Sequence, residues 1–347
     1  MIALGLDTFG DVTVDEHGTL KSHAQVVRDV VDEAVLADQV GVDALGVGEH
    51  HRPDFAISSP EMVLAAIAAR TDRLVLGSAV TVLSTDDPVR VFERYATLDA
   101  VSNGRAEVVL GRGSFTESYP LFGFDLTRYD ELFEERVDLF ARLLDGGPIR
   151  WDGRTRPALE VEGVYPTPEH GRLRTWVGVG GSPDSVVRAA RFGFPLMLAI
   201  IGGNPLRFRS YAELYREALE RLGREPLPIA VHSHGYVAES DDQALRDLWP
   251  HYEPMIRRIG GERGWAPPTL TQFEREAGVH GSLYAGSPET VARKIVATVR
   301  GLGLSRFDMK YSCGTLPHDR MMRSIELYGT RVMPLVQDML GDADTAS

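Results

Sequence analysis

The stretch "GVDALGVGEHH", residues 41–51, decides the predicted fold. A short apolar run ends abruptly in Glu49, His50 and His51. A run without polar alternation is typical of a parallel strand that is buried on both faces. Comparable runs recur along the chain, at 2–7, 74–83, 106–111, 175–180, 195–201, 229–238 and 306–311. With the run at 44–48, they predict eight buried strands.

Amphipathic segments with recognisable ends separate these runs. Residues 26–41 place apolar side chains at helical spacing and stop at a glycine. Residues 58–71 and 86–104 each open with a capping residue followed by proline, Ser59-Pro60 and Asp87-Pro88. Strands that alternate with helices in this way predict a closed, TIM-type (β/α)8 barrel with insertions, formed by one domain over residues 1–340.

Two segments interrupt the alternation of strands and helices. Residues 145–174 are rich in Gly, Pro and Arg, which predicts an irregular insertion that contains a hairpin. A second insertion is expected near 245–285, where "PHYEPMIRRIGGERGWAPPTL" indicates a long loop acting as a lid or binding segment. Residues 341–347 are expected to form a tail.

The composition excludes several classes of partner. The formal net charge of -13 repels nucleic acid and anionic membrane surfaces. No apolar run reaches the roughly 18 residues of a membrane span, and the first residues lack the basic start of a signal peptide. Cys313 is the one cysteine, so no intrachain disulfide can form, and a buried, inert thiol is expected. These features predict a cytoplasmic protein.

The polar residues that follow the strands are the candidates for chemistry, because such barrels place active sites at the carboxyl ends of their strands. His50 and His51 are adjacent, so one ring can point into the barrel mouth while the other packs sideways. An imidazole that titrates near pH ~6.5 suits proton transfer. Two alternatives stay open: hydrogen bonds that cap the loop, and metal ligation together with Asp54, His232 or His234.

"GVGGSPDSV", residues 178–186, presents free backbone amides between a strand and a helix. Such amides attract phosphate, and Arg112, one strand earlier, could bind the same group bidentately. Ser-Pro-acid also recurs at 59–61 and 287–289, where it opens other helices, so an ordinary helix cap remains an alternative. A surface ion pair remains the alternative for Arg112.

Several of these motifs occur together in one known family. The order of "GVDALGVGEHH" (41–51), "LVLGSAVTVLSTDDPVRVFERYATLDAVSNGRAEVVLGRG" (74–113) and "WVGVGGSPDSVVRAARFGFPLM" (176–197) resembles the bacterial luciferase-like flavin-dependent monooxygenases. The resemblance covers roughly the first 200 residues and returns at "GSPETVARKI" (286–295).

This resemblance implies a barrel that binds reduced FMN at its mouth and activates O2 through a flavin C4a-peroxide. His50 matches the catalytic histidine of the family, and His51 matches its neighbour. Ala79–Val80 matches a non-prolyl cis peptide beneath the flavin ring, followed by Thr81. The phosphate-binding positions carried over from the family are Arg112, Gly180, Gly181, Ser182 and Ser185.

Two positions depart from luciferase itself. Gly111 stands where luciferase has a reactive cysteine, and Gly180 stands where it has an acidic residue. The first change bears on substrate and on the lifetime of the oxygenated flavin more than on the reaction class. Light emission is therefore not expected.

The function expected from these residues is an FMN-dependent monooxygenase acting with O2 on a small organic substrate, supplied with FMNH2 by a separate flavin reductase. The family also implies a homodimer through the helices that flank the second and third strands. Three rivals stay open: a deazaflavin-dependent hydride-transfer enzyme, a non-catalytic partner resembling the luciferase beta subunit, and a metallohydrolase. The substrate is not predicted, although Phe115, Tyr119 and Trp265 are candidates for an apolar pocket.

Overall fold

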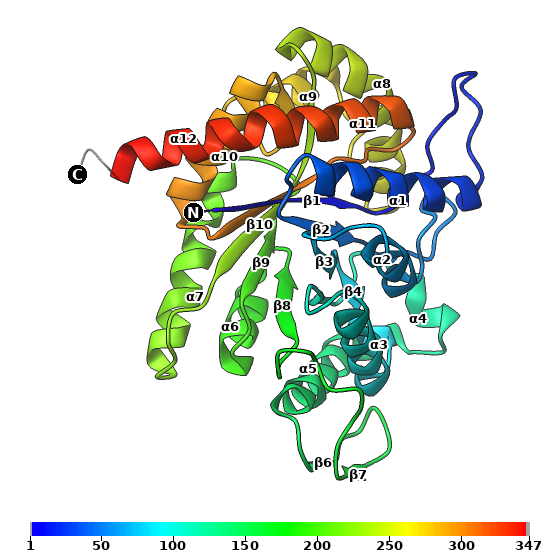
Figure 1. Cartoon of the computed structure of the whole chain (residues 1–347), viewed down its shortest axis with the longest axis vertical. Helices are drawn as coiled ribbons and strands as arrows, with labels where there is room; N and C mark the ends of the chain where they lie inside the picture. Colours follow the sequence, from blue (N-terminus) through cyan, green and yellow to red (C-terminus); the bar gives the residue numbers. More distant parts are fainter. Residues whose placement is uncertain (1, 345–347) are drawn as a thin grey trace.

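A ring of parallel strands forms the centre of the molecule in the computed structural model, which describes residues 2–344 (Figure 1). The strands neighbour one another in the order β3-β2-β1-β12-β10-β9-β8-β5-β4, and a bridge between Leu76 and Ala106 joins β3 to β5 and closes the ring. The bounds are β1 Ala3–Thr8, β2 Ala44–Val47, β3 Val75–Ser78, β4 Thr81–Val82, β5 Glu107–Gly111, β8 Arg174–Val179, β9 Leu196–Ala199, β10 Ile229–Val237 and β12 Arg306–Lys310. The predicted barrel is confirmed: all eight expected strands occur, the third divided into β3 and β4.

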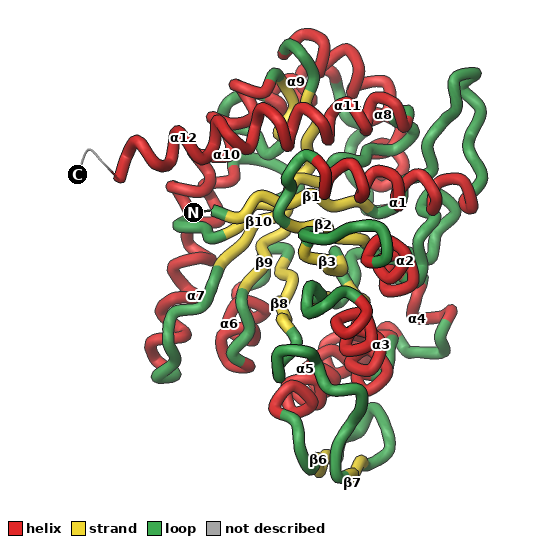
Figure 2. The backbone as a smooth tube through the Cα atoms, in the orientation of Figure 1, coloured by secondary structure: helices red, strands yellow, loops and turns green. Residues whose placement is uncertain are grey.

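Helices cover the outside of this barrel, as Figure 2 shows with strands at the centre and helices around them. They are α1 His23–Gln39, α2 Pro60–Ala68, α3 Pro88–Val101, α5 Tyr129–Asp145, α6 Pro183–Phe192, α7 Arg209–Arg221, α10 Pro288–Leu302, α11 His318–Leu327 and α12 Met333–Asp344. The predicted cap of α3 is present, because Asp87 accepts from the amides of Val89 and Arg90. Ser59 occupies the cap position of α2 without a side-chain capping bond.

The two insertions differ in how well the sequence predicted them. Residues 145–174 contain the expected hairpin, β6 Ile149–Trp151 paired antiparallel with β7 Leu159–Val161. The loop expected near 245–285 is wrong, because that region holds α8 Asp241–Glu262, α9 Leu270–Ala277 and β11 Tyr284–Gly286. Pro250 and Pro254, which indicated a loop, lie inside α8. The helix tolerates them because burial of Leu248 and Met255 against the core stabilises it despite two lost backbone donors.

The expected tail also begins too early, since α12 continues to Asp344; residues 345–347 lie outside the described part of the chain. Within the described residues, no helix has both the length and the hydropathy needed to cross a membrane.

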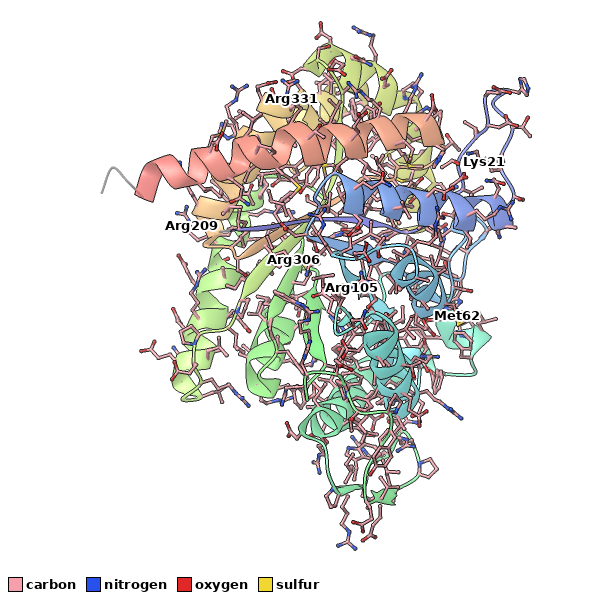
Figure 3. The ribbon with its side chains drawn as sticks, viewed as in Figure 1. Lys21, Met62, Arg105, Arg209, Arg306 and Arg331 are labelled. Carbon is pink, nitrogen blue, oxygen red and sulfur yellow. The ribbon has the colours of Figure 1, made fainter. Side chains whose placement is uncertain are left out.

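The inside of the barrel is charged, whereas the apolar core lies between the strands and the helices. Arg306, labelled at the centre of Figure 3, donates from Nη1 to Glu107 Oε1 at 2.6 Å and from Nε to Asp308 Oδ1 at 2.8 Å. Glycines leave room for this network, since a Cβ on Gly5 would lie 2.1 Å from Asp308 Oδ1. Buried charges are tolerated when they are paired and hydrogen-bonded, as these are.

Candidate active site

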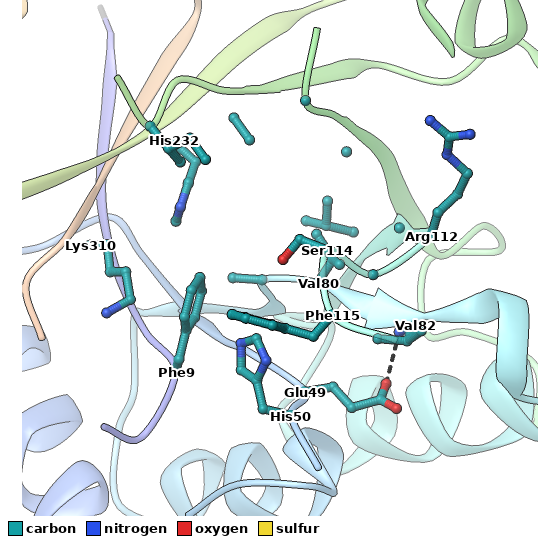
Figure 4. Close-up of a pocket in the computed structure, with 18 of the residues that line it drawn as sticks. Phe9, Glu49, His50, Val80, Val82, Arg112, Ser114, Phe115, His232 and Lys310 are labelled. Atoms are coloured by element: carbon teal, nitrogen blue, oxygen red, sulfur yellow. Dashed lines mark hydrogen bonds between the residues drawn. The ribbon is translucent and has the colours of Figure 1, made fainter. Parts of the chain in front are cut away.

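A pocket of about 370 Å³ opens at the carboxyl ends of the barrel strands (Figure 4). Loops after β2, β3, β5 and β8 and the second half of α8 contribute to its walls. Seven predicted site residues line it: His50, His51, Ala79, Val80, Arg112, Gly180 and Ser185. Thr81, Gly181 and Ser182 do not line it. Residues predicted from four separate strands therefore meet in one cavity.

His50 lies in an aromatic cluster on one side of this pocket. Its ring packs at 4.6 Å from the ring of Phe9, 4.4 Å from Phe55 and 5.3 Å from Phe115, measured between ring centroids. Burial lowers the pKa of His50 from 6.5 to about 3. At neutral pH the ring is therefore uncharged and can accept a hydrogen bond, whereas the sequence alone suggested an ordinary pKa of ~6.5 that suits proton transfer.

His51 turns sideways, as expected for the second of two adjacent residues. Its Nε2 lies 3.0 Å from Glu49 Oε1, and its ring meets that of Phe122 edge-on at 5.0 Å. The second oxygen of Glu49 accepts the amide of Val82 at 2.8 Å. Glu49 thus fixes the histidine loop to β4, a positioning role that the sequence did not reveal.

Two guanidinium groups converge at the opposite side of the pocket. Arg112 donates from Nη2 to Ser185 Oγ at 3.1 Å, and Arg188 donates from Nη1 to the same oxygen at 3.4 Å. Arg112 also pairs with Asp130 at 2.7 Å, and Arg188 pairs with Glu134 at 2.6 Å. Burial lowers the pKa of Arg188 most, and the positive charge of Arg112 lowers it further. Two like charges held this close favour an anion between them.

Backbone groups of the β8–α6 turn lie beside these arginines. Gly180 lines the pocket, and the space that its Cβ would occupy is open to 4 Å. Gly181 has a φ of 109°, a conformation that side chains disfavour, and its carbonyl accepts from the Tyr211 hydroxyl at 2.8 Å. Ser182 is the cap residue of α6 but makes no side-chain capping bond. The cap interpretation of this motif is therefore weaker here than at Ser287, which accepts from Thr290.

The predicted cis peptide between Ala79 and Val80 is confirmed. Val80 lies against β5 and β8 inside the barrel, so a Cβ on Gly111 would lie 2.2 Å from its Cγ2 and one on Gly178 3.1 Å from its Cγ1. A cysteine side chain at position 111 would therefore collide with Val80.

Several residues that line the pocket were not assigned to catalysis or cofactor binding from the sequence, and His232 was named only as a possible metal ligand. His232 Nδ1 lies 2.6 Å from Asp7 Oδ2, and Lys310 Nζ lies 2.9 Å from Asp11 Oδ2 and 4.5 Å from the centre of the Phe9 ring. Their signal in the sequence is alternation: positions 7 and 9 share a strand face, as do 232 and 234, and 306, 308 and 310. Without the barrel, that alternation does not say which face points inward.

The other candidates are placed as follows. Phe115 and Trp265 line the pocket, whereas Tyr119 does not and is fully buried elsewhere. Cys313 is buried as expected, and burial raises the pKa of its thiol to about 12, which agrees with the inert interpretation. In the described part of the chain, no group of three or more His, Cys, Asp or Glu side chains is arranged to hold a metal. Asp54, one proposed ligand, instead pairs with Arg52 and Arg258.

Comparison with known proteins gives one family. The model described as luciferase-like monooxygenase matches residues 8–306. The 4-hydroxyprotoasukamycin monooxygenase of Streptomyces nodosus subsp. asukaensis is 37% identical over 335 residues, covering 89% of this chain and 86% of that protein. The alkanal monooxygenase alpha chain of Photorhabdus laumondii is 28% identical over 252 residues, covering 70% and 69%.

Solved structures share the whole fold. A monooxygenase from Streptomyces bottropensis superposes with a TM-score of 0.80 at 23% identity, covering 96% of this chain and 99% of that one. The oxygenating constituent of 3,6-diketocamphane monooxygenase from Pseudomonas putida, solved with FMN, has a TM-score of 0.78 at 19% identity over 97% and 99%. An F420-dependent secondary alcohol dehydrogenase reaches 0.76 at 16% identity over 96% and 99%. At these identities the structures establish the fold alone.

Proposed function

Because this chain belongs to the luciferase-like monooxygenase family, we propose that it is a flavin-dependent monooxygenase that binds reduced FMN in the barrel mouth. With O2, it would oxidise a small organic substrate. The observation that carries this proposal is the meeting of Arg112 and Arg188 on Ser185, at the edge of a pocket whose other side holds His50.

The arginine side of the pocket fits the phosphate of FMN. Arg112 and Arg188 can each donate to a phosphate oxygen, and Ser185 Oγ lies between them. Gly180 leaves the backbone accessible, since no atom lies within 4 Å of where its Cβ would stand. Guanidinium groups and free main-chain amides at a helix start are the groups that proteins use to hold phosphate.

The interior of the pocket fits a flat ring system. Val80, Val109 and Met197 form an apolar surface inside the barrel. Gly111 and Gly178 carry no side chains, which leaves room for Val80 to pack against the backbone of β5 and β8 there. This glycine-lined, apolar floor would hold the isoalloxazine ring between the arginines and the aromatic cluster around His50.

Reduced FMN supplies the two electrons with which O2 is activated, and the protein supplies orientation, dryness and proton control. His50, which burial keeps neutral at pH 7, can accept a hydrogen bond from a molecule bound in the pocket. Phe9, Phe55 and Phe115 around it exclude water and offer an apolar surface to the substrate. Met255, Ile256 and Ile259 of α8 extend that surface over the mouth.

A deazaflavin-dependent oxidoreductase is the second candidate, because an F420-dependent dehydrogenase shares this fold. The arginine pair alone does not distinguish the two cofactors, since both carry phosphate. A non-catalytic partner role is less well supported, because the chain keeps both the histidine and the arginine sides of the pocket.

Titration of the purified protein with reduced FMN, riboflavin and F420 tests the proposal. We expect FMN to bind more tightly than riboflavin, which has the same ring without the phosphate, and more tightly than F420. Preference for F420 would make hydride transfer the better proposal. Equal binding of FMN and riboflavin would remove the phosphate site from it.

Partners and assembly are part of the proposal. The structural relative from Pseudomonas putida is named as an oxygenating constituent, which supports a separate flavin reductase as the source of FMNH2. Met62 on α2, labelled in Figure 3, and Val101 on α3 are apolar side chains with exposed fractions of 69% and 53%, which supports a homodimer through these helices. Light scattering of wild type and Met62→Glu measures that assembly. A cytoplasmic location remains a proposal from the net charge and the single cysteine.

A further inference from the structure

Three histidine rings of the pocket differ in what binds their nitrogens. His232 on β10 places Nδ1 at 2.6 Å from Asp7 Oδ2 on β1. The rings of His50 and His234 have no such bond to any residue that the structure describes. His51, at the rim, is bound to Glu49 instead. Of the three inner rings, His232 is therefore the one joined to a carboxylate.

The Asp7–His232 pair is isolated within the barrel. Asp7 is 1% exposed, and its second oxygen, Oδ1, has no hydrogen-bond partner among the described residues. Lys310, the nearby cation on β12, is bound to Asp11 and to Ser312. The imidazole is thus the group that balances the charge of Asp7, because a buried carboxylate without a cationic partner is strongly unfavourable.

The free nitrogen of His232 belongs to the pocket. Since Nδ1 is bonded to Asp7, Nε2 is the nitrogen left for a bound molecule. Figure 4 shows the His232 ring extending from its strand into the cavity toward Phe9, with which it stacks at 5.8 Å. Its strand, β10, is separated from β2 by β1 and β12, and Phe9 contacts both the His232 and the His50 rings.

We propose that the Asp7–His232 dyad is the proton donor of this pocket. This proposal rests on the proposed flavin-dependent function. The N–H bond at Nε2 breaks, the proton passes to an oxygen or nitrogen atom of the bound flavin or substrate, and the neutral imidazole regains a proton from water at the mouth. Asp7 keeps its charge throughout and orients the ring. His50 is a neutral acceptor in this division of roles.

The charges around His232 agree with this geometry. Burial lowers the pKa of His232 most, and the charge of Lys310 lowers it slightly. The charge and hydrogen bond of Asp7, and next the charge of Asp308, together raise the pKa by more, so it lies above 6.5. Burial lowers the pKa of His234, on the same strand face, to about 3. Burial raises the pKa of Asp308 to about 6, so in acid Asp308 loses its negative charge and raises the pKa of His232 less.

Titration of the ring nitrogens by NMR in wild-type protein without flavin is the first test. Resonances of His232 and His50 would be assigned through bonds to the backbone. We expect the His232 midpoint to lie above 6.5, so that both nitrogens carry protons at pH 6, while His50 stays neutral down to pH 5. A His232 ring that is neutral at pH 6 would overturn the donor role without any variant.

Paired variants test the cause of the shift. Asp7→Asn should bring the His232 midpoint below 6.5, because burial then acts without the opposing charge. His234→Gln is the matched control: it removes a partly buried ring from the same strand face and should leave that midpoint unchanged. Equal midpoints in wild type and a folded Asp7→Asn would refute the dyad.

Oxygen consumption by the protein loaded with reduced FMN links the dyad to turnover. From pH 6 to 9, we expect the rate to fall as pH rises through the His232 midpoint, and His232→Gln to slow it by about 100-fold or more. FMN affinity should remain within a few-fold, which separates a proton role from lost binding. Failure of wild type to bind FMN would overturn the proposed function and the donor role together. A flat pH profile in protein that binds FMN would overturn the donor role alone.

Discussion

Replacing Arg188 by glutamine should weaken FMN far more than riboflavin. Arg188 lies on α6 with its side chain 12% exposed, and it meets Arg112 at Ser185 Oγ. A phosphate bound there would receive charge-assisted hydrogen bonds from both guanidinium groups. Riboflavin presents no charge to this site, so its affinity should depend little on Arg188.

The size of the effect follows from these contacts. A hydrogen bond to a charged group contributes about 1.5–3 kcal/mol, which corresponds to about 10- to 150-fold in affinity. The upper part of this range suits Arg188, since its low exposure limits screening by water. Arg112 donates to Asp130 from Nη1 and to Ser185 from Nη2, and the negative charge of Asp130, which is 75% exposed, should make the net contribution of Arg112 smaller. Asp130→Asn should accordingly tighten FMN, by up to about 1 kcal/mol, the value of an exposed ion pair.

Equilibrium titration followed by flavin fluorescence measures both ligands on the same protein. Arg191→Gln is the matched control, because Arg191 is on the same helix and also pairs with Glu134 but does not contact Ser185. We expect the FMN-to-riboflavin affinity ratio to fall in Arg188→Gln and to stay at the wild-type value in Arg191→Gln. Equal losses for the two flavins would show that Arg188 supports the fold and not the phosphate.

Three further outcomes follow from other contacts. Gly111→Cys should cost about 1–3 kcal/mol of unfolding free energy and weaken flavin binding, because its Cβ would collide with Val80; unchanged urea unfolding would contradict this. Arg52→Met should destabilise the closure of α8 over the pocket, since Arg52 bonds to Glu117 and Glu262; hydrogen exchange at 258–263 should increase, and unaltered exchange would count against it. In the folded protein the pKa of His50 is about 3, whereas in the unfolded chain it is ~6.5. Below pH ~6.5 the unfolded state therefore binds a proton that the folded state does not, and the free energy of unfolding falls as the pH is lowered. At pH 5 this loss is about 2 kcal/mol for His50, and unfolding of His50→Phe at pH 7 and 5 should lack it; an identical pH dependence in both proteins would refute the burial of a neutral ring.

The sequence predicted those parts of the site that have local signatures. Ser59 and Asp87 precede proline at helix starts, and Arg112 follows an apolar run, so each can be placed relative to its own strand. Loops follow strands, and the carboxyl ends of parallel strands meet at one edge, which is enough to bring His50 and Arg112 into one pocket. Arg188 gave no comparable signal, because an arginine in the second turn of a helix is usually a solvated side chain.

The prediction of a loop at residues 245–285 was wrong because the local signals there point away from the structure that forms. Pro250 and Pro254 are strong local signals against a helix, but α8 is stabilised by contacts with residues far away in the chain. Tertiary burial of Leu248 and Met255 outweighs the local cost of the prolines, and no pattern within residues 245–285 records that burial.

The sequence by itself determined the barrel, because the alternation of buried strands and capped helices depends on residues close together in the chain. It also determined which loops carry the chemistry. Only the tertiary structure decided the protonation of the pocket: His50 and His232 are both histidines after or within apolar strands. One is buried among phenylalanine rings, and the other is bonded to Asp7, 225 positions away along the chain. The pKa of a group depends on the charges and water around it in space, and closure of the barrel brings those charges together.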